Sequence, residues 1–268
     1  MTDAEKVFRD ITAIREKAPV ILSITNYVVT NTTANALLAI GASPIMSHAV
    51  EEMAEIVAIS GAVVINLGTI ATEYVAAMDP AWTAADEHGV PVVLDPVGAG
   101  ASRLRTDTPL ALLAAHKPFI VRGNASEIMT IAGESGAAAR GVDSSAGSDA
   151  AGGAALALAE KHGGAVAVSG EADIVIDAAG TRARVLGGSA LMPRVTGLGC
   201  TATAICAAFA AVNKNPFEAA LHACVTMKTA GEIAAAKSAG PGTLQLHFYD
   251  ALYNMSAKDV AEHLKVER

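Results

Sequence analysis

A glycine-rich turn ahead of a long apolar stretch is the feature of this chain best suited to chemistry. Residues 195–205 read Val-Thr-Gly-Leu-Gly-Cys-Thr-Ala-Thr-Ala-Ile, so Gly197 and Gly199 precede a predicted helix. Glycines let a ligand approach the backbone closely, and the N–H groups of a first helical turn, with the helix dipole, favour an anion such as phosphate. A plain turn before a core helix would have the same sequence. The segment therefore indicates either an anion site or a structural turn.

Cys200 lies at the start of the same predicted helix. The positive end of the helix dipole lowers the pKa of a thiol, which would make Cys200 a candidate base or nucleophile. A buried, inert cysteine is the alternative interpretation. Cys206 and Cys224 lie within predicted helices, where the inert interpretation is favoured.

Two carboxylates directly follow predicted strands. Asp95 ends the run Val-Pro-Val-Val-Leu-Asp and precedes Pro-Val-Gly-Ala-Gly, and Glu127 lies in Arg-Gly-Asn-Ala-Ser-Glu. Open α/β sheets bind ligands at the carboxyl ends of their strands, and two acids at such ends would suit Mg²⁺. Structural interpretations remain open, since Asp-Pro commonly opens turns and Asn124 with Glu127 has the spacing of a capping box.

The glycine segment also matches a relaxed dinucleotide-binding pattern. Residues 197–202 read Gly-Leu-Gly-Cys-Thr-Ala, and Glu218 lies about where an acid that binds ribose should fall. A dinucleotide-binding unit must continue from this helix into a parallel strand, but residues 213–216 lead into a second predicted helix. The context therefore argues against a dehydrogenase. The seven histidines show no metal-ligand spacing and support no catalytic triad.

Short apolar runs alternate with Ala-rich helical patterns, which predicts a parallel sheet covered by helices. The predicted strands span residues 20–24, 62–67, 90–94, 119–122 and 165–169. The helical patterns include residues 51–59 and 72–88, and residues 173–177 and 182–186 form a predicted hairpin. From residue 200 onward the pattern predicts only helices, at 200–212, 216–238, 243–253 and 257–266. A glycine-rich stretch at 133–153 is predicted as a surface loop that runs into a helix, within a single domain over residues 1–268.

Composition limits the classes of partner. The formal charge is −8, charged residues make up 17% of the chain, and no basic run is present, which argues against nucleic acid and anionic membranes. The longest nearly apolar run, residues 200–212, is too short to span a bilayer. The charged start has no signal-peptide pattern, and the odd number of cysteines suggests no disulfide framework. These features favour the reducing cytoplasm.

The motifs together resemble the hydroxyethylthiazole kinase family of the thiamine pathway over nearly the whole chain. The resemblance rests on the segments that begin at Ser23, Leu38, Asp95, Arg122, Ser169 and Thr196, including Asp-Pro-Val-Gly-Ala-Gly and Thr-Gly-Leu-Gly-Cys. It implies a ribokinase-like α/β fold with a central, mostly parallel sheet. It also implies a homotrimer with active sites between subunits, and ATP-dependent, Mg²⁺-assisted phosphorylation of 4-methyl-5-(2-hydroxyethyl)thiazole.

Roles for individual residues follow from the same resemblance. Met46 and Gly197 would contact the thiazole, and Arg122, Ser169 and Asn26 would contact ATP. Asp95 and Glu127 would organise Mg²⁺ and phosphates, and Cys200 would occupy the position of the usual catalytic base. Ser169 stands where the family more often has Thr, and Leu198 where it has a small residue between the glycines.

Two alternatives stay open beside this interpretation. Hydroxymethylpyrimidine kinases can share the Gly-x-Gly-Cys segment, although residues 23–31 favour the thiazole enzyme. A nucleotide-binding regulatory protein without turnover is the second alternative. The presence of Asp95, Glu127 and Arg122 argues against it.

Overall fold

The computed structural model describes residues 1–133 and 145–268, which build a nine-stranded sheet. The strands are β1 (Val20–Ile24), β2 (Ser43–Met46), β3 (Ala62–Asn66), β4 (Val92–Asp95), β5 (Ile120–Asn124), β6 (Ala165–Ser169), β7 (Asp173–Asp177), β8 (Arg182–Val185) and β9 (Val266–Glu267). Their order across the sheet is β2-β1-β3-β4-β5-β6-β7-β8-β9. Strands β2 to β6 pair in parallel, and β7, β8 and β9 are added in antiparallel pairs. The predicted, mostly parallel α/β sheet is therefore confirmed.

Helices cover both faces of this sheet. They are α1 (Asp3–Lys17), α2 (Thr30–Ile40), α3 (Met53–Ala58), α4 (Thr72–His88), α5 (Arg103–Ala115), α6 (Ala125–Ile131), α7 (Ser145–His162), α8 (Leu198–Ala210), α9 (Pro216–Ala236), α10 (Pro241–Asn254) and α11 (Ala257–His263). Short 3₁₀ turns lie at Val50–Glu52 and Met192–Arg194.

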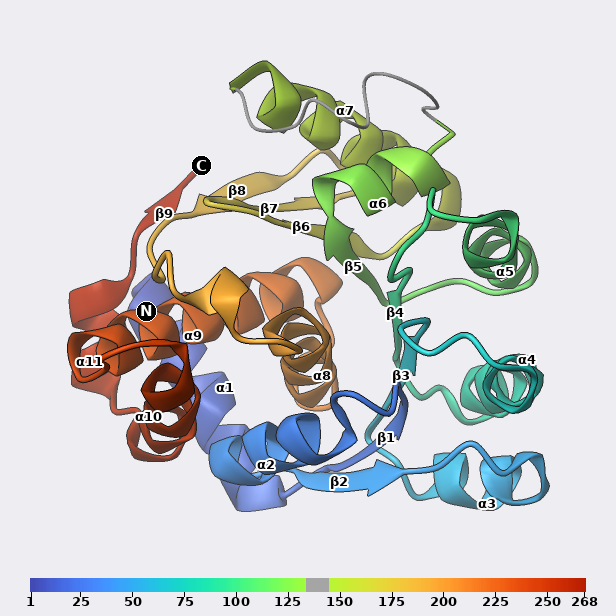
Figure 1. The fold of residues 1–268 in the computed structure, drawn as a ribbon, viewed down its shortest axis with the longest axis horizontal. Coiled ribbons are helices and arrows are strands. Elements are labelled where there is room, and N and C mark those ends of the chain that lie inside the picture. Colours follow the sequence, from blue (N-terminus) through green and yellow to red (C-terminus); the bar gives the residue numbers. More distant parts are fainter. Residues whose placement is uncertain (134–144) are drawn as a thin grey trace.

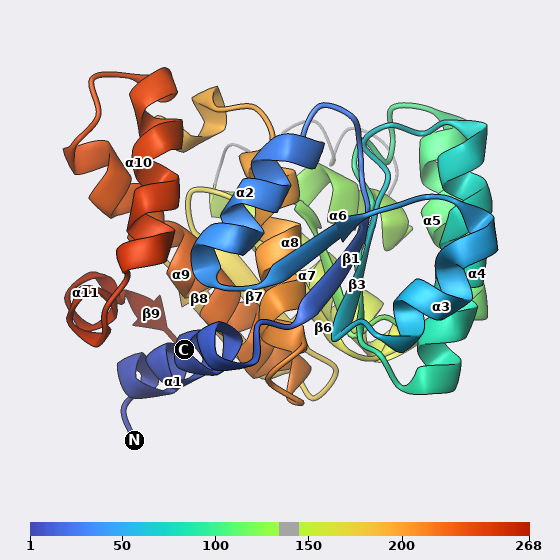
Figure 2. The same ribbon diagram turned by 90° about the horizontal axis from the view of Figure 1, so that it is seen from below.

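Two hydrophobic clusters separate the helices into layers. One cluster joins α1, α2, α8, α9, α10 and α11 to one face of the sheet, and the other joins α3 to α7 to the opposite face. Figure 1 shows these layers on either side of the strands, with α8 against the centre of the sheet. Both faces of the central strands are therefore buried, as their continuous apolar runs predict. Figure 2 shows β1, β2 and β3 side by side from another direction.

Several elements differ from the sequence-based expectations. Strand β9 contradicts the prediction of only helices after residue 200, because Val266 and Glu267 pair with β8 instead of extending α11. The edge strand β2 and helices α1, α2 and α5 were not among the predicted elements, and β2 has only half-buried residues and contains Pro44. The predicted hairpin is confirmed by the pairing of β7 with β8. Part of the predicted glycine-rich loop, residues 134–144, lies outside the described residues.

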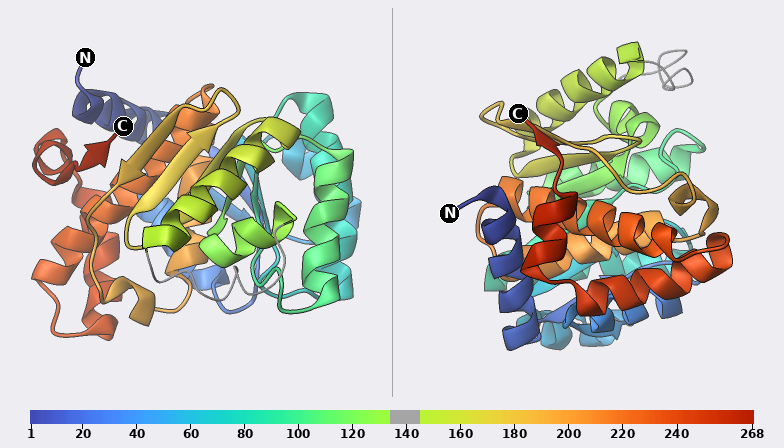
Figure 3. Two further views of the ribbon diagram at one scale, coloured as in Figure 1. Left: turned by 90° about the horizontal axis from the view of Figure 1, so that it is seen from above. Right: turned by 90° about the vertical axis from the view of Figure 1, so that its left-hand side faces the viewer.

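The two ends of the chain lie close together. The Arg268 guanidinium contacts the Asp3 carboxylate at 2.9 Å, and Figure 3 shows α1 beside α11 and β9. Within residues 1–133 and 145–268, no helix is long and apolar enough to cross a membrane.

Candidate active site

The carboxyl ends of β3 and β4 place two polar side chains next to each other. Asn66 and Asp95 are register partners on these parallel strands, and Asn66 Nδ2 donates a hydrogen bond of 2.8 Å to Asp95 Oδ2. Parallel strands end at the same edge of a sheet, which is where open α/β folds bind ligands. The predicted position of Asp95 at this edge is confirmed.

Asp95 is held through one of its two carboxylate oxygens. Oδ2 accepts from Asn66 and also from the Thr203 hydroxyl of α8 at 2.6 Å, and Arg122 Nη1 lies 4.0 Å away. Oδ1 is buried without a hydrogen-bond partner among the described residues. The side chain is therefore fixed at Oδ2, and Oδ1 is the oxygen with unused acceptor capacity.

Burial governs the charge of this carboxylate. Asp95 is 1% exposed, and desolvation raises its pKa to about 6. Arg122 and the hydrogen bonds from Thr203 and Asn66 lower the pKa, while the neighbouring Glu127 carboxylate raises it. A buried carboxylate with these neighbours favours the approach of a cation or a proton.

A chain of side-chain amides links Asp95 to Cys200. Asn66 Oδ1 accepts a hydrogen bond of 2.9 Å from Asn26 Nδ2, and the same Asn26 nitrogen lies 3.3 Å from Cys200 Sγ as a donor. Asn26 follows β1, so β1, β3, β4 and α8 all contribute to this chain. The structure brings Asn26, Cys200 and Asp95 together, as expected for parts of one site.

The expected effect of the helix dipole on Cys200 is wrong in direction. Burial, followed by the repulsion from Asp95, raises the pKa of the thiol above its usual value, although Asn66, Asn26 and Arg122 oppose the rise. Desolvation outweighs the helix N-terminus here. The thiol is therefore mostly protonated near neutral pH.

Glu127 forms the capping box that its spacing predicts. The Asn124 side chain accepts from Glu127 N, and Glu127 Oε2 accepts from Asn124 N at 2.8 Å. Glu127 Oε1 also accepts from Gly98 N at 2.9 Å, which ties α6 to the glycine-rich loop after Asp95. Glu127 thus has a structural role that the structure confirms. Any role with a metal would be additional.

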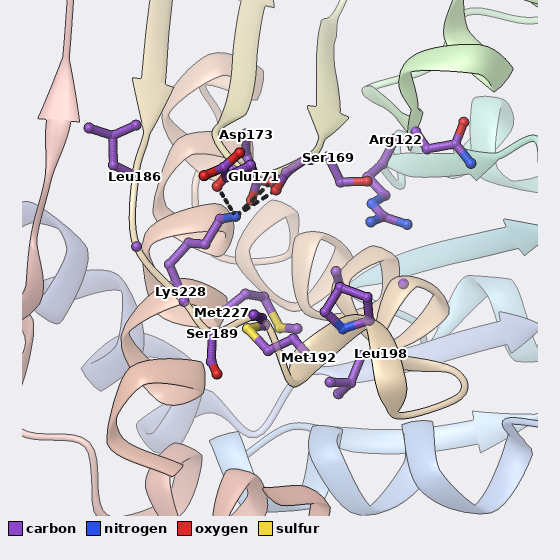
Figure 4. Close-up of a pocket in the computed structure, with 18 residues that line it drawn as sticks. Arg122, Ser169, Glu171, Asp173, Leu186, Ser189, Met192, Leu198, Met227 and Lys228 are labelled. Carbon is purple, nitrogen blue, oxygen red and sulfur yellow. Dashed lines mark hydrogen bonds and ion pairs between the residues drawn. The ribbon is translucent and has the colours of Figure 1, made fainter. Parts of the chain in front are cut away.

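Arg122 and Ser169, for which the resemblance implies contacts with ATP, both line a cavity of about 850 Å³. The Ser169 hydroxyl donates to Gly123 O at 3.3 Å across β5 and β6. Burial opposes the charge of Arg122, but Asp95 and Asp173 raise its pKa, so the guanidinium stays positive. Figure 4 shows Arg122 and Ser169 at one end of this cavity.

The start of α8 forms another wall of the cavity. Gly197 caps this helix with a φ of +83°, which favours glycine, and Leu198 and Gly199 line the cavity. A Cβ at position 199 would lie 3.2 Å from Arg122 Nη1. The glycine at 199 therefore lets the first turn of α8 approach a cation closely.

The remaining predicted contacts do not line this cavity. Met46 is half-buried at the end of β2, opposite Ser23 of β1. A Cβ at Gly197 would lie 2.4 Å from Val29 Cγ1, so this glycine packs closely against the segment that precedes α2. Asn26 and Cys200 likewise belong to the amide chain and not to the cavity wall. Asn26, Gly197 and Cys200 therefore mark a second region at the start of α8, and Met46 lies at the end of β2.

Several polar residues of the site were not predicted. Asn66 and Thr203 hold Asp95, and Lys228 and Asp173 line the cavity. Asn66 could have been found from its position at the end of a buried strand. Thr203 and Lys228 gave no such signal, because they lie within apolar helices. No group of three or more His, Cys, Asp or Glu side chains that could hold a metal occurs in the described part of the chain.

Known proteins resemble this chain over its full length. The model of the hydroxyethylthiazole kinase family matches residues 11–258. A hydroxyethylthiazole kinase of Nitratidesulfovibrio vulgaris (strain Miyazaki F) is 50% identical over 268 residues, which is 100% of both chains. That of Syntrophus aciditrophicus is 50% identical and covers 98% of this chain and 97% of its own.

Solved structures of other proteins share the fold of this chain. A hydroxyethylthiazole kinase protein from Pyrococcus horikoshii OT3 superposes with a TM-score of 0.90 at 37% identity and covers 98% of each chain. A ribokinase-like superfamily protein from Enterococcus faecalis has a TM-score of 0.64 at 13% identity, covering 90% of this chain and 87% of its own, which shows a shared fold.

Proposed function

The chain belongs to the hydroxyethylthiazole kinase family, and from this premise we propose how its residues divide the work of the reaction. The enzyme transfers the γ-phosphoryl group of ATP to the hydroxyl of 4-methyl-5-(2-hydroxyethyl)thiazole, for thiamine phosphate synthesis. A bond forms between the hydroxyl oxygen and the γ-phosphorus, the bond to the β-phosphate bridge breaks, and the hydroxyl loses a proton. Catalysis of this transfer is mainly positioning and charge stabilisation.

One observation carries the assignment of the nucleotide site. The cavity beside α8 joins a largely enclosed cation, Arg122, whose side chain is 12% exposed, to the N-terminal turn of a helix and to a hydroxyl, Ser169. All three features stabilise phosphate oxygens. The opposite walls include Met192, Pro193 and Met227, which suit an apolar, flat base. We therefore place the phosphates toward Arg122 and the base toward the methionines.

Asp95 and Glu127 are the residues that we propose to hold Mg²⁺. The buried Asp95 Oδ1 lacks a partner among the described residues, and the two carboxylates repel one another. Hard oxygen ligands of this kind fit Mg²⁺, which uses few protein carboxylates together with phosphates. When bound, the ion would neutralise charge on the phosphates. The chain's own contribution is to fix Asp95 through Asn66 and Thr203.

We propose that the thiazole alcohol binds at the start of α8, next to Cys200 and Gly197, and that it contacts Met46. The raised pKa keeps most of the Cys200 thiol protonated near neutral pH, and only the small thiolate fraction can accept the proton of the alcohol. We therefore propose that Cys200 is an auxiliary proton acceptor and not a covalent nucleophile. Phosphoryl transfer passes through a loose transition state, in which the alcohol can keep its proton until late. Asn26 would orient the thiol through its amide.

Assembly is the next part of the proposal. We propose a homotrimer with active sites between subunits, since Tyr27 and Val28 are 60% and 66% exposed directly beside Asn26. Exposed apolar groups next to a site suit a surface that another subunit covers. Light scattering at assay concentration tests this, and a fully active monomer would contradict it. We also propose one domain over residues 1–268 and a cytoplasmic location, which suits ATP use and three free thiols.

The function is tested by incubating the pure protein with Mg²⁺-ATP and either the thiazole alcohol or hydroxymethylpyrimidine. The product is identified by mass. We expect the thiazole phosphate to form at least ten-fold faster than the pyrimidine phosphate, in line with the range for groups of different shape and polarity. Preference for the pyrimidine would refute the substrate assignment. A Leu198→Ala variant tests whether the larger side chain at this position limits the pocket.

A further inference from the structure

Lys228 is a buried lysine on the wall of the proposed nucleotide cavity. It lies in the middle of α9, among mostly buried neighbours, and only 8% of its surface is exposed. Lysine is almost never buried to this extent unless its charge is paired. The residues around Lys228 must therefore provide partners for its charge.

The ammonium group of Lys228 is fully engaged by one turn of the chain. Nζ donates to Gly170 O at 2.8 Å and to Glu171 O at 3.0 Å, and it lies 3.2 Å from Asp173 Oδ1. An ammonium ion has three N–H groups, so these three oxygens use all of them. Figure 4 shows the lysine reaching across to the turn. No donor is left for a phosphate.

The turn itself, residues 169–173, forms part of the cavity. It joins β6 to β7, and Ser169, Gly170, Glu171 and Asp173 all line the cavity. Gly170 N donates to Asp173 Oδ1 at 3.0 Å, which closes the turn on itself. Gly170 and Glu171 are exposed and bury no apolar side chain. Besides the pairing of β6 with β7, polar contacts from α9 therefore restrain this turn.

The stem of Lys228 also supports a second wall. A Cβ at Gly188 would lie 3.0 Å from Lys228 Cδ, so the glycine segment after β8 packs directly on the lysine. Both Gly187 and Gly188 line the cavity. One side chain thus connects two cavity walls that are distant in sequence.

We propose that Lys228 is a positioning residue for the nucleotide, which holds turn 169–173 in its ATP-binding shape and does not contact the phosphates. This inference rests on the proposed placement of ATP in the cavity. A lysine that bound phosphate directly would need at least one N–H group directed away from the turn. The geometry instead makes Ser169 the contact and Lys228 its support.

The test compares Lys228→Met with the wild type, with KM for ATP, KM for the thiazole alcohol and kcat measured separately. We expect the KM for ATP to rise by about ten- to a hundred-fold, the range for misplacement of a binding group by a remote change. The KM for the thiazole alcohol should stay within about two-fold, because Met46 and Gly197 do not line the cavity to which turn 169–173 belongs. Lys6→Met is the matched control. It removes a lysine that pairs with Glu218, which lies in α9 like Lys228 but outside the cavity.

A second pair of variants keeps the inference testable if Lys228→Met folds poorly. Asp173→Asn retains the hydrogen-bonding shape of the turn, and combining it with Lys228→Met leaves no buried charge without a partner. We expect the double variant to bind ATP at least three-fold more tightly than Lys228→Met alone, measured by calorimetry. Calorimetry with ATP does not require turnover, so a failure of the thiazole assay in the wild type is separate from a failure here.

Three outcomes would overturn the inference. The first is an unchanged affinity for ATP in folded Lys228→Met. The second is a fall in kcat with an unchanged KM for ATP, which would indicate a direct contact with the phosphates in the transition state. Equal ATP affinities for the single and double variants would also contradict it, because the uncompensated charge of Asp173 would then have no effect on the turn.

Discussion

Replacement of Thr203 by valine removes one of the contacts that fix Asp95 and leaves the shape of the side chain nearly unchanged. The Thr203 hydroxyl donates to Asp95 Oδ2 at 2.6 Å, and both residues are buried. A hydrogen bond to a charged group contributes about 1.5–3 kcal/mol. If this energy acts in the transition state, kcat/KM falls by about ten- to a hundred-fold.

The same substitution changes the pH dependence of stability. The Thr203 hydrogen bond lowers the pKa of Asp95, so its loss raises that pKa further above about 6. Because the pKa of Asp95 in the folded protein exceeds its unfolded value, stability is lost as pH rises from about 4 through 6. In the Thr203→Val variant, stability is lost over a pH range that extends to higher pH than in the wild type. The difference in unfolding free energy between wild type and Thr203→Val should therefore be larger at pH 8 than at pH 5.

Two further variants make this prediction decisive. Thr203→Ser keeps the hydroxyl and should restore most of kcat/KM. Thr226→Val removes another buried hydroxyl, which donates to His222 O within α9, and should leave kcat/KM within two-fold. Denaturant unfolding and steady-state kinetics provide the two measurements. Wild-type kinetics in Thr203→Val, or an equal loss in Thr226→Val, would refute the role of Thr203 in holding Asp95.

Three other predictions follow from the structure. Cys200→Ala should retain measurable activity and Cys200→Asp should be active, and an intact-mass adduct of Cys200 with ATP would contradict an auxiliary base. Glu127→Gln keeps one acceptor oxygen, so it can retain the contact with Asn124 N or with Gly98 N but not both; it should cost about 1 kcal/mol of stability and lose most turnover, and unchanged turnover would remove Glu127 from the metal site. Burial opposes the charge of His116, but Asp79 and Asp86 raise its pKa. The His116→Asn substitution should therefore lower the free energy of unfolding by up to about 1 kcal/mol below pH 6.5, and by less as pH rises through the raised pKa. A loss that is constant with pH in denaturant unfolding would contradict this.

Much of the fold could be predicted because burial and sequence pattern agree in the centre of the sheet. Strands β1 and β6 have the predicted bounds, and their residues are mostly buried. At the edges the agreement fails, because β2 is half-buried and contains proline, and β9 has only two residues. Helix α1 had a usable signal, since Thr2 and Glu5 form a capping box, but its apolar face is short.

The position of site residues was predictable where they lie at a strand end or at the glycine-rich start of a helix. Asp95, Arg122 and Ser169 lie at or near the ends of predicted strands, so their common edge could be expected. Lys228 could not be found in this way, because a lysine within a helix normally lies on a solvated face. Its function depends on turn 169–173, which α9 meets only in the folded chain.

Cys200 shows why local sequence gives the place of a group more readily than its protonation. The helix start is visible in the sequence and favours a thiolate, but the enclosure of Sγ and the charge of Asp95 come from distant segments and have the opposite effect. The amides of Asn26 and Asn66 compensate only in part. A thiol that keeps its proton cannot drive early deprotonation of the alcohol. The rate acceleration must therefore come mainly from the groups that bind the phosphates. We propose that Arg122, whose side chain is 12% exposed, and the fixed carboxylate of Asp95 are among these groups.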